Sequence, residues 1–145
     1  MANKYAKKPT ITIARQKLDL LNKFKGVIVE SSLNHLLWRG TIKPTPLSLS
    51  YSVEVNYRIG EHPIVFVSGD NLKNLNSPSF PHHFEIFPAE NKVEICLYRY
   101  YEFTKKDFLS ATIIPWTIEW LYFYEIWLST GIWCGGGEHP PCKKK

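Results

Sequence analysis

The sequence lacks the features that mark secreted and nucleotide-hydrolysing proteins. Its 145 residues include three cysteines, an odd number, and no apolar run of the signal-peptide type follows Met1. We therefore expect free thiols in a reducing, cytoplasmic compartment. No glycine-rich phosphate loop, pair of catalytic carboxylates or Ser/His/Asp order stands out, so none of these catalytic machineries is indicated.

Hydrophobic runs long enough to cross a membrane are also absent. The longest apolar stretch, from Ile113 to Leu128, is shorter than the roughly 20 residues that span a bilayer. Glu119 and Glu125 interrupt it. The stretch predicts a buried helix, and we expect no membrane partner.

The net charge of +5 comes from the two ends of the chain. Three lysines (Lys4, Lys7 and Lys8) lie near the start, and three (Lys143, Lys144 and Lys145) end the chain. Subtracting these six from the 18 Lys and Arg leaves 12 basic residues against 13 acidic ones. A near-neutral body with basic, solvated tails does not favour a nucleic-acid partner.

What the sequence does contain is enough apolar residues for one packed domain. Hydrophobic residues make up 44% of the chain and aromatic residues 14%, which is too apolar for a disordered protein. We predict flexible tails at 1–9 and 134–145 around a single domain at 10–133.

The domain is predicted to begin with a helix over residues 10–25. Apolar residues recur at steps of three and four and would share one buried face: Ile11, Ala14, Leu18, Leu21 and Phe24. Thr10 or Thr12 can cap its start, and Gly26 can end it.

Four strands are predicted to follow in an antiparallel meander. The first contains residues 27–29, the second residues 36–42, and the fourth residues 64–67. The third, residues 51–59, alternates apolar and polar side chains most clearly, as expected for a strand with one buried face. These elements and the helices predict an α+β fold.

Beyond the meander, residues 68–94 are rich in Asn and Pro and predict an irregular connection. A second helix is predicted from Pro115 to Thr130, because proline suits the first turn and Gly131 the position after the end. Apolar and aromatic residues cover nearly every side of this helix, so it must pack against the sheet or a partner.

Cys96 is the candidate nucleophile. It lies in an apolar, strand-like stretch between a loop with His82 and His83 and the aromatic helix. A small buried residue is the ordinary role of a free cysteine, whereas a reactive thiol needs partial exposure and polar neighbours. Both interpretations stay open on these residues alone.

Cys134, His139 and Cys142 supply three potential metal ligands near the end of the chain. A structural zinc site needs four, usually in closely spaced pairs. We therefore predict neither a metal nor another cofactor.

The order helix, meander, His-containing loop, Cys and helix resembles the layout of ubiquitin-conjugating (UBC-fold) enzymes. Ile95-Cys96-Leu97 resembles the surroundings of that family's acceptor cysteine, and residues 81–83 (Pro-His-His) resemble a counterpart of its His-Pro-Asn signature. Residues 112–121, 124–131 and 135–140 are similar to a bacterial branch, the stand-alone conjugating-enzyme-like protein of short type II CBASS anti-phage operons. The resemblance covers roughly residues 10–140 and implies a bacterial, cytoplasmic UBC-like domain.

The resemblance implies a cysteine-dependent transferase. The cysteine would take the C-terminus of a protein as a thioester and pass it to an amine, such as that of a lysine on an acceptor. In the CBASS branch the implied partner is the cGAS-like nucleotidyltransferase of the same operon, and the transfer would prime synthesis of a cyclic nucleotide signal.

Departures from the family pattern affect the remaining site residues. Phe84 stands where the signature asparagine would follow His83. His82, His83 and Asn91 are therefore alternative donors to the oxyanion, while Tyr98 and Asp107 are candidates to border the incoming amine. A second hypothesis is a non-catalytic UBC-like module that positions a cyclase or a ubiquitin-like partner.

Overall fold

The computed structural model describes residues 9–136, so that most of both predicted tails lies outside the described residues. The elements follow in the order α1 (Ile13–Lys23), β1 (Gly26–Ser31), β2 (His35–Ile42), β3 (Tyr51–Arg58), β4 (Ile64–Ser68), β5 (His83–Phe87), η1 (Pro88–Glu90), β6 (Lys92–Ile95), η2 (Tyr98–Glu102), η3 (Leu109–Ala111) and α2 (Ile113–Thr130). The predicted α+β class is confirmed.

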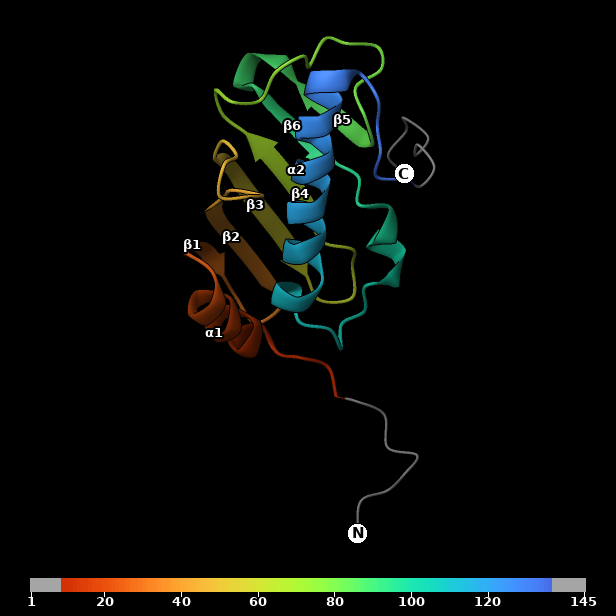
Figure 1. The fold of residues 1–145 in the computed structure, drawn as a ribbon. Helices are drawn as coiled ribbons and strands as arrows, with labels where there is room; N and C mark the ends of the chain where they lie inside the picture. The colour runs from red at the N-terminus through yellow and green to blue at the C-terminus, as the bar shows by residue number, and fades with distance from the viewer. Residues whose placement is uncertain (1–8, 137–145) are drawn as a thin grey trace.

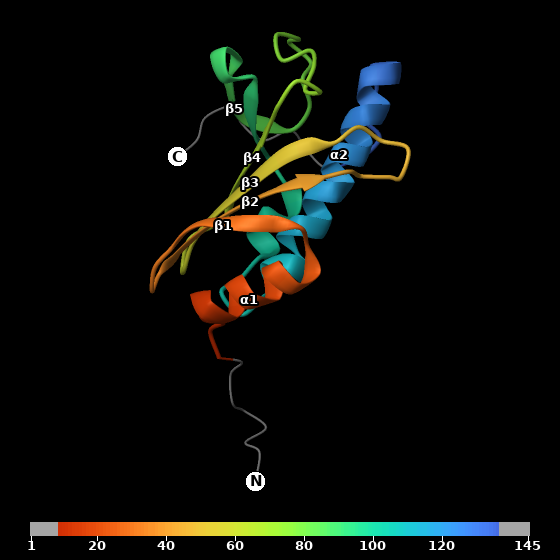
Figure 2. The same cartoon turned by 90° about the vertical axis from the view of Figure 1, so that its left-hand side faces the viewer.

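A six-stranded sheet forms one layer, and the helices cover one of its faces. The strand order is β1-β2-β3-β4-β6-β5, with every neighbouring pair antiparallel. Helix α2 crosses the sheet, while α1 lies at its β1–β2 end (Figures 1 and 2). The predicted four-strand meander is confirmed as β1 to β4.

The alternation along β3 explains how the sheet is held to the helices. Tyr51, Val53, Val55 and Tyr57 are buried, while the residues between them are more exposed. Successive side chains of a strand point to opposite faces, so one face joins the core and the other meets solvent. Burying each of the two valine side chains contributes about 1.5–3 kcal/mol.

Helix α2 ends as predicted and begins two residues earlier. Gly131 adopts φ 75°, and its N–H donates to Trp127 O at 2.7 Å, which closes the last turn. The buried residues include Ile114, Leu121 and Tyr124, which lie in the core beneath the helix. No helix in the described range is long and apolar enough to cross a membrane.

Helix α1 buries a different face from the one predicted. Thr12 is the cap, its Oγ1 accepting from Arg15 N at 3.2 Å, and the helix ends at Lys23, before Gly26 begins β1. Leu18 is 64% exposed, whereas Gln16 is fully buried. The prediction was wrong because a buried polar residue, which the apolar pattern ignores, lies at the centre of the packed face.

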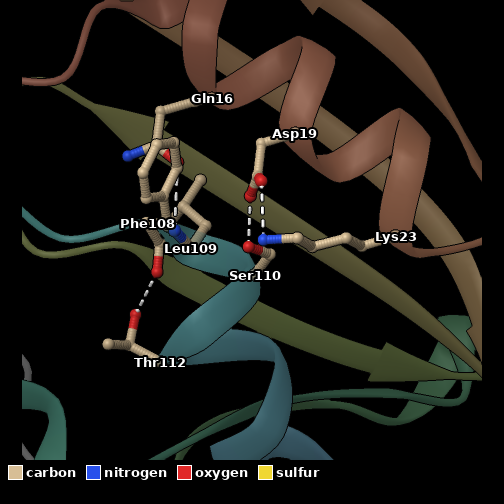
Figure 3. A network of polar contacts seen from close by, with 7 residues as sticks. All are labelled: Gln16, Asp19, Lys23, Phe108, Leu109, Ser110 and Thr112. Carbon is tan, nitrogen blue, oxygen red and sulfur yellow. Dashed lines mark hydrogen bonds and ion pairs between the residues drawn. The ribbon is translucent and has the colours of Figure 1, made fainter.

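Gln16 joins α1 to the segment before α2 (Figure 3). Its Oε1 accepts from Leu109 N at 3.0 Å, as Figure 3 shows. Its Nε2 donates to Asp107 O at 2.8 Å. One turn later, Asp19 accepts from the Ser110 hydroxyl and pairs with Lys23 at 2.8 Å. A polar side chain at a buried position is stable only with such partners.

The prediction that residues 68–94 are irregular was wrong for their second half. Strand β5 lies at the edge of the sheet and β6 enters between β4 and β5, pairing Val67 with Val93. The two strands have only five and four residues and lie among prolines and asparagines, so the turn-forming residues dominated the sequence pattern. Strand β6 leads directly to Cys96.

Candidate active site

Cys96 follows the last residue of β6 and is held by its backbone. Its N–H donates to His82 O at 2.8 Å, which joins the end of β6 to the residue just before β5. The residue is 7% exposed. The fold thus fixes the thiol in place and buries it almost completely.

A cavity of about 20 Å³ lies beside Cys96, and we call it the Cys96 crevice. Its walls come from four parts of the chain. These are the end of β6 with Cys96, Leu97 and the nearby His82; Arg99 of η2; four α2 residues, Trp116, Glu119, Trp120 and Phe123; and Trp133 and Gly135 beyond α2. A cavity of this size holds about one water molecule. The thiol therefore borders a narrow, mainly aromatic space.

Burial and charge disfavour the thiolate. Burial and, to a smaller extent, the nearby Glu94 carboxylate together raise the pKa of Cys96 from 9.0 to about 11. At pH 7 only about one thiol in ten thousand would be ionised. Two charged side chains, Arg99 and Glu119, also line the crevice and pair with each other at 3.4 Å.

His82 is the loop histidine that lines the crevice. It is 1% exposed and has φ 33°, an uncommon backbone conformation for a residue other than glycine. Its carbonyl accepts from both Cys96 N and Trp120 Nε1, the latter at 3.2 Å. Its ring lies 4.9 Å from that of Trp133. These contacts hold the imidazole in the same enclosed space as the thiol.

His83 occupies a neighbouring but separate position. It begins β5 opposite Ile95, with its Nδ1 bonded to Phe84 O at 2.9 Å and its ring 5.4 Å from Phe80. It is not among the residues that line the crevice. The loop therefore presents one histidine to the thiol's surroundings and packs the other against the core.

The structure does not bring Asn91 or Asp107 to Cys96. Asn91 precedes β6, so the whole strand separates it from Cys96, and its amide donates to Gly69 O and Leu72 O. Asp107 Oδ2 accepts from Thr104 N at 2.8 Å, and the Asp107 carbonyl is bonded to Gln16. Both side chains stabilise turns.

The structure describes Tyr98 and the potential metal ligands only in part. Tyr98 begins η2, two residues after Cys96, and its side chain lies outside the described part. Of the three potential metal ligands near the C-terminus, only Cys134 is described, and it is exposed. Among residues 9–136 no group of three or more His, Cys, Asp or Glu side chains is placed to hold a metal.

Trp133 was missed as a site residue, because the sequence indicated only that the domain ends there. Its ring lies 5.8 Å from Trp120 and 5.9 Å from Phe123, as well as against His82. The available signal was a tryptophan two residues after the glycine that ends the helix, since tryptophan side chains are usually largely buried.

The fold and the position of Cys96 are compatible with one known class of protein. An antiparallel sheet with helices on one face, and a cysteine placed after a strand, are compatible with a ubiquitin-conjugating, or E2-like, domain.

The family follows from comparison with known proteins. A family model described as type II CBASS E2 protein matches residues 16–140, most of the chain, and the protein belongs to this family. No curated protein matches the chain. Membership identifies an E2-like protein of CBASS defence.

Proposed function

We propose that this protein is a cysteine-dependent protein-conjugating enzyme of anti-phage defence in the bacterial cytoplasm. Cys96 would accept the C-terminus of a partner protein as a thioester and pass it to a lysine amine on an acceptor. The partner would be the cGAS-like nucleotidyltransferase of the same operon. Family membership supports the conjugating class, and Cys96 supplies its chemistry.

The reaction would proceed in two acyl transfers. The Cys96 thiolate attacks the carbonyl of an activated C-terminus, such as an acyl adenylate or a thioester, and the activating group departs with the electron pair. The lysine amine then attacks the Cys96 thioester, the sulfur leaves as thiolate, and the amine proton passes to a base or water. Activation is required because a free carboxylate does not acylate a thiol at a useful rate.

One observation carries the proposal: Cys96 lines the crevice together with His82. The His82 imidazole would stabilise the oxyanion of each tetrahedral intermediate, and its position in the lining of the same crevice supports this role. His83 would support the loop, and Tyr98 would border the amine. Asn91 and Asp107 leave the proposed machinery because their side chains and backbone groups hold turns elsewhere.

The test is a thioester trap. Incubating the protein with the operon's nucleotidyltransferase and the activating components should give an adduct that reductant cleaves. Cys96→Ala should lose the adduct, and Cys96→Ser should give a reductant-resistant oxygen ester. Cys134→Ser is the matched control, since Cys134 is an exposed thiol in the same chain. An adduct that survives in Cys96→Ala and disappears in Cys134→Ser would overturn the assignment.

Burial of Cys96 favours a second candidate, a non-catalytic module that binds and positions a cyclase or a ubiquitin-like partner. A cysteine that is 7% exposed and has a pKa raised to about 11 also fits a purely structural role in the core. Phage protection separates the two candidates. A binding module would keep full protection in Cys96→Ala, whereas the transferase would lose it.

A further inference from the structure

The residues after α2 turn back to form one wall of the Cys96 crevice. Gly131 adopts a left-handed conformation at the end of the helix and redirects the chain. We call the described residues that follow, 132–136, the C-terminal strap. Two of them, Trp133 and Gly135, line the crevice with Cys96.

Ring contacts hold the strap in place. The Trp133 ring lies 4.9 Å from His82, 5.8 Å from Trp120 and 5.9 Å from Phe123. Gly135 sits so closely that a Cβ there would lie 2.8 Å from the Trp133 ring and 2.9 Å from the Phe123 ring. The strap therefore fits the crevice through one large aromatic side chain and one residue without a side chain.

Of the crevice walls, the strap is the one whose displacement would break the fewest hydrogen bonds to the rest of the fold. Its hydrogen bonds within the described residues are local, from Ile132 N to Thr130 Oγ1 at 3.1 Å and from Trp133 Nε1 to Gly136 O at 3.1 Å. By contrast, Cys96 and His82 share a backbone hydrogen bond, and the remaining aromatic wall belongs to an 18-residue helix. Gly131 and Gly136, both at positive φ, flank the strap residues that line the crevice.

Some wall has to move for Cys96 to react with a protein tail. An attacked carbonyl must come within about 3–3.5 Å of the sulfur. The crevice has room for about one water molecule, which is too little for a carbonyl carbon and its two substituents.

We propose that the C-terminal strap is a built-in cover that occupies the place of the incoming donor tail and must undock before Cys96 can be acylated. The contacts around Trp133 support the inference that the strap covers Cys96. The inference that this cover regulates acylation rests on the proposed function. Partner binding that displaces the strap would couple acylation to the arrival of the correct donor, because the exposed thiol would exist only in the open state.

The experiment measures how fast iodoacetamide alkylates Cys96 in the full chain, by peptide-resolved mass spectrometry. Glutathione added to every sample serves as the reference thiol, because the exposed Cys134 belongs to the strap itself. Trp133→Ala removes all three ring contacts, and Gly135→Ala adds only a Cβ where no room exists. Ile132→Ala is the matched control, because Ile132 belongs to the strap but is exposed and does not line the crevice.

We expect both Trp133→Ala and Gly135→Ala to raise the Cys96 alkylation rate by about tenfold or more, since aromatic pairs add measurably to docking beyond their buried area. Ile132→Ala should keep the wild-type rate. Circular dichroism and thermal unfolding verify that each variant is folded. Wild-type rates in folded Trp133→Ala and Gly135→Ala would overturn the cover, as would an equal rise in Ile132→Ala.

The same variants separate failure of the cover from failure of the proposed function. With an activated donor, Trp133→Ala should form the thioester faster than the wild type. Faster alkylation with no thioester in either protein would leave the cover standing and reject the transferase. A thioester that forms at equal rates in both proteins would reject the cover and leave the transferase.

Discussion

Replacing Gln16 by alanine should destabilise the protein far more than the loss of a polar side chain from a helix surface would. Gln16 is fully buried in α1 and donates to Asp107 O and accepts from Leu109 N. Alanine removes both hydrogen bonds and leaves two backbone groups of the 107–109 segment without these partners. Together with the hydrogen bond from Ser110 to Asp19, Gln16 links α1 to the segment that leads into α2 (Figure 3).

The size of the expected stability loss depends on how deeply the two backbone groups are buried. Leu109 is fully buried, so its orphaned N–H should cost about 1–3 kcal/mol, while the half-buried Asp107 carbonyl should cost less because water can reach it. Together we expect a loss of about 2–4 kcal/mol, a large part of the roughly 5–15 kcal/mol that stabilises a domain. The melting temperature should fall by roughly 10 °C.

Urea unfolding followed by circular dichroism measures this loss. Leu18→Ala on the same helix is the matched control, because that side chain is 64% exposed and its removal should change stability by no more than about 0.5 kcal/mol. If Gln16→Ala were as stable as Leu18→Ala, the reasoning that a buried polar bridge joins the two segments would be refuted.

Two further predictions concern the thiol and the sheet. The folded-state pKa of Cys96, about 11, lies above its ordinary 9.0, so the stability that the neutral buried thiol contributes is complete below pH 9 and is lost as the pH rises toward 11. The wild type should therefore lose up to about 1.4 kcal/mol per pH unit relative to Cys96→Ala in that window, measured by urea unfolding; a constant difference from pH 8 to 10.5 would contradict burial of the thiol. Gly40→Ala should cost about 2–3 kcal/mol, because its Cβ would lie 2.5 Å from the Trp38 ring and 2.7 Å from Lys25 O. Gly60→Ala, with open space but φ 89°, should cost only about 1 kcal/mol, and equal losses at the two glycines would count against the close approach of Trp38.

The elements with a strong period were predictable from the sequence. The first four strands and the end of α2 follow from alternation and from a helix-ending glycine, which are local signals. Strands β5 and β6 were not predictable in the same way. Each is short, η1 and an αL asparagine at position 91 separate them, and pairing with β4 supplies the order that local sequence lacks.

The face of α1 shows why apolar spacing alone misleads. Leu18 and Leu21 fit the helical period but face outward, while Gln16 packs inward because its amide satisfies two backbone groups 91 and 93 residues away. Such a long-range partner has no trace in the local pattern.

The site was predictable only in part, for a similar reason. Cys96 and His82 meet because the end of β6 is bonded to the residue before β5, and their nearness in the sequence hinted at this. Asn91 is nearer to Cys96 in the sequence than His82 but lies beyond the other end of β6. Trp133 reaches the crevice through the turn at Gly131, which the sequence marked as an end of structure.

Mass spectrometry of the protein after incubation with its activated donor tests the central proposal most directly. The account predicts an acyl group on the Cys96 sulfur that hydroxylamine or reductant removes, and its transfer to an amine when an acceptor is added. An intact, unmodified Cys96 beside a fully active defence system, or full phage protection by Cys96→Ala, would contradict it.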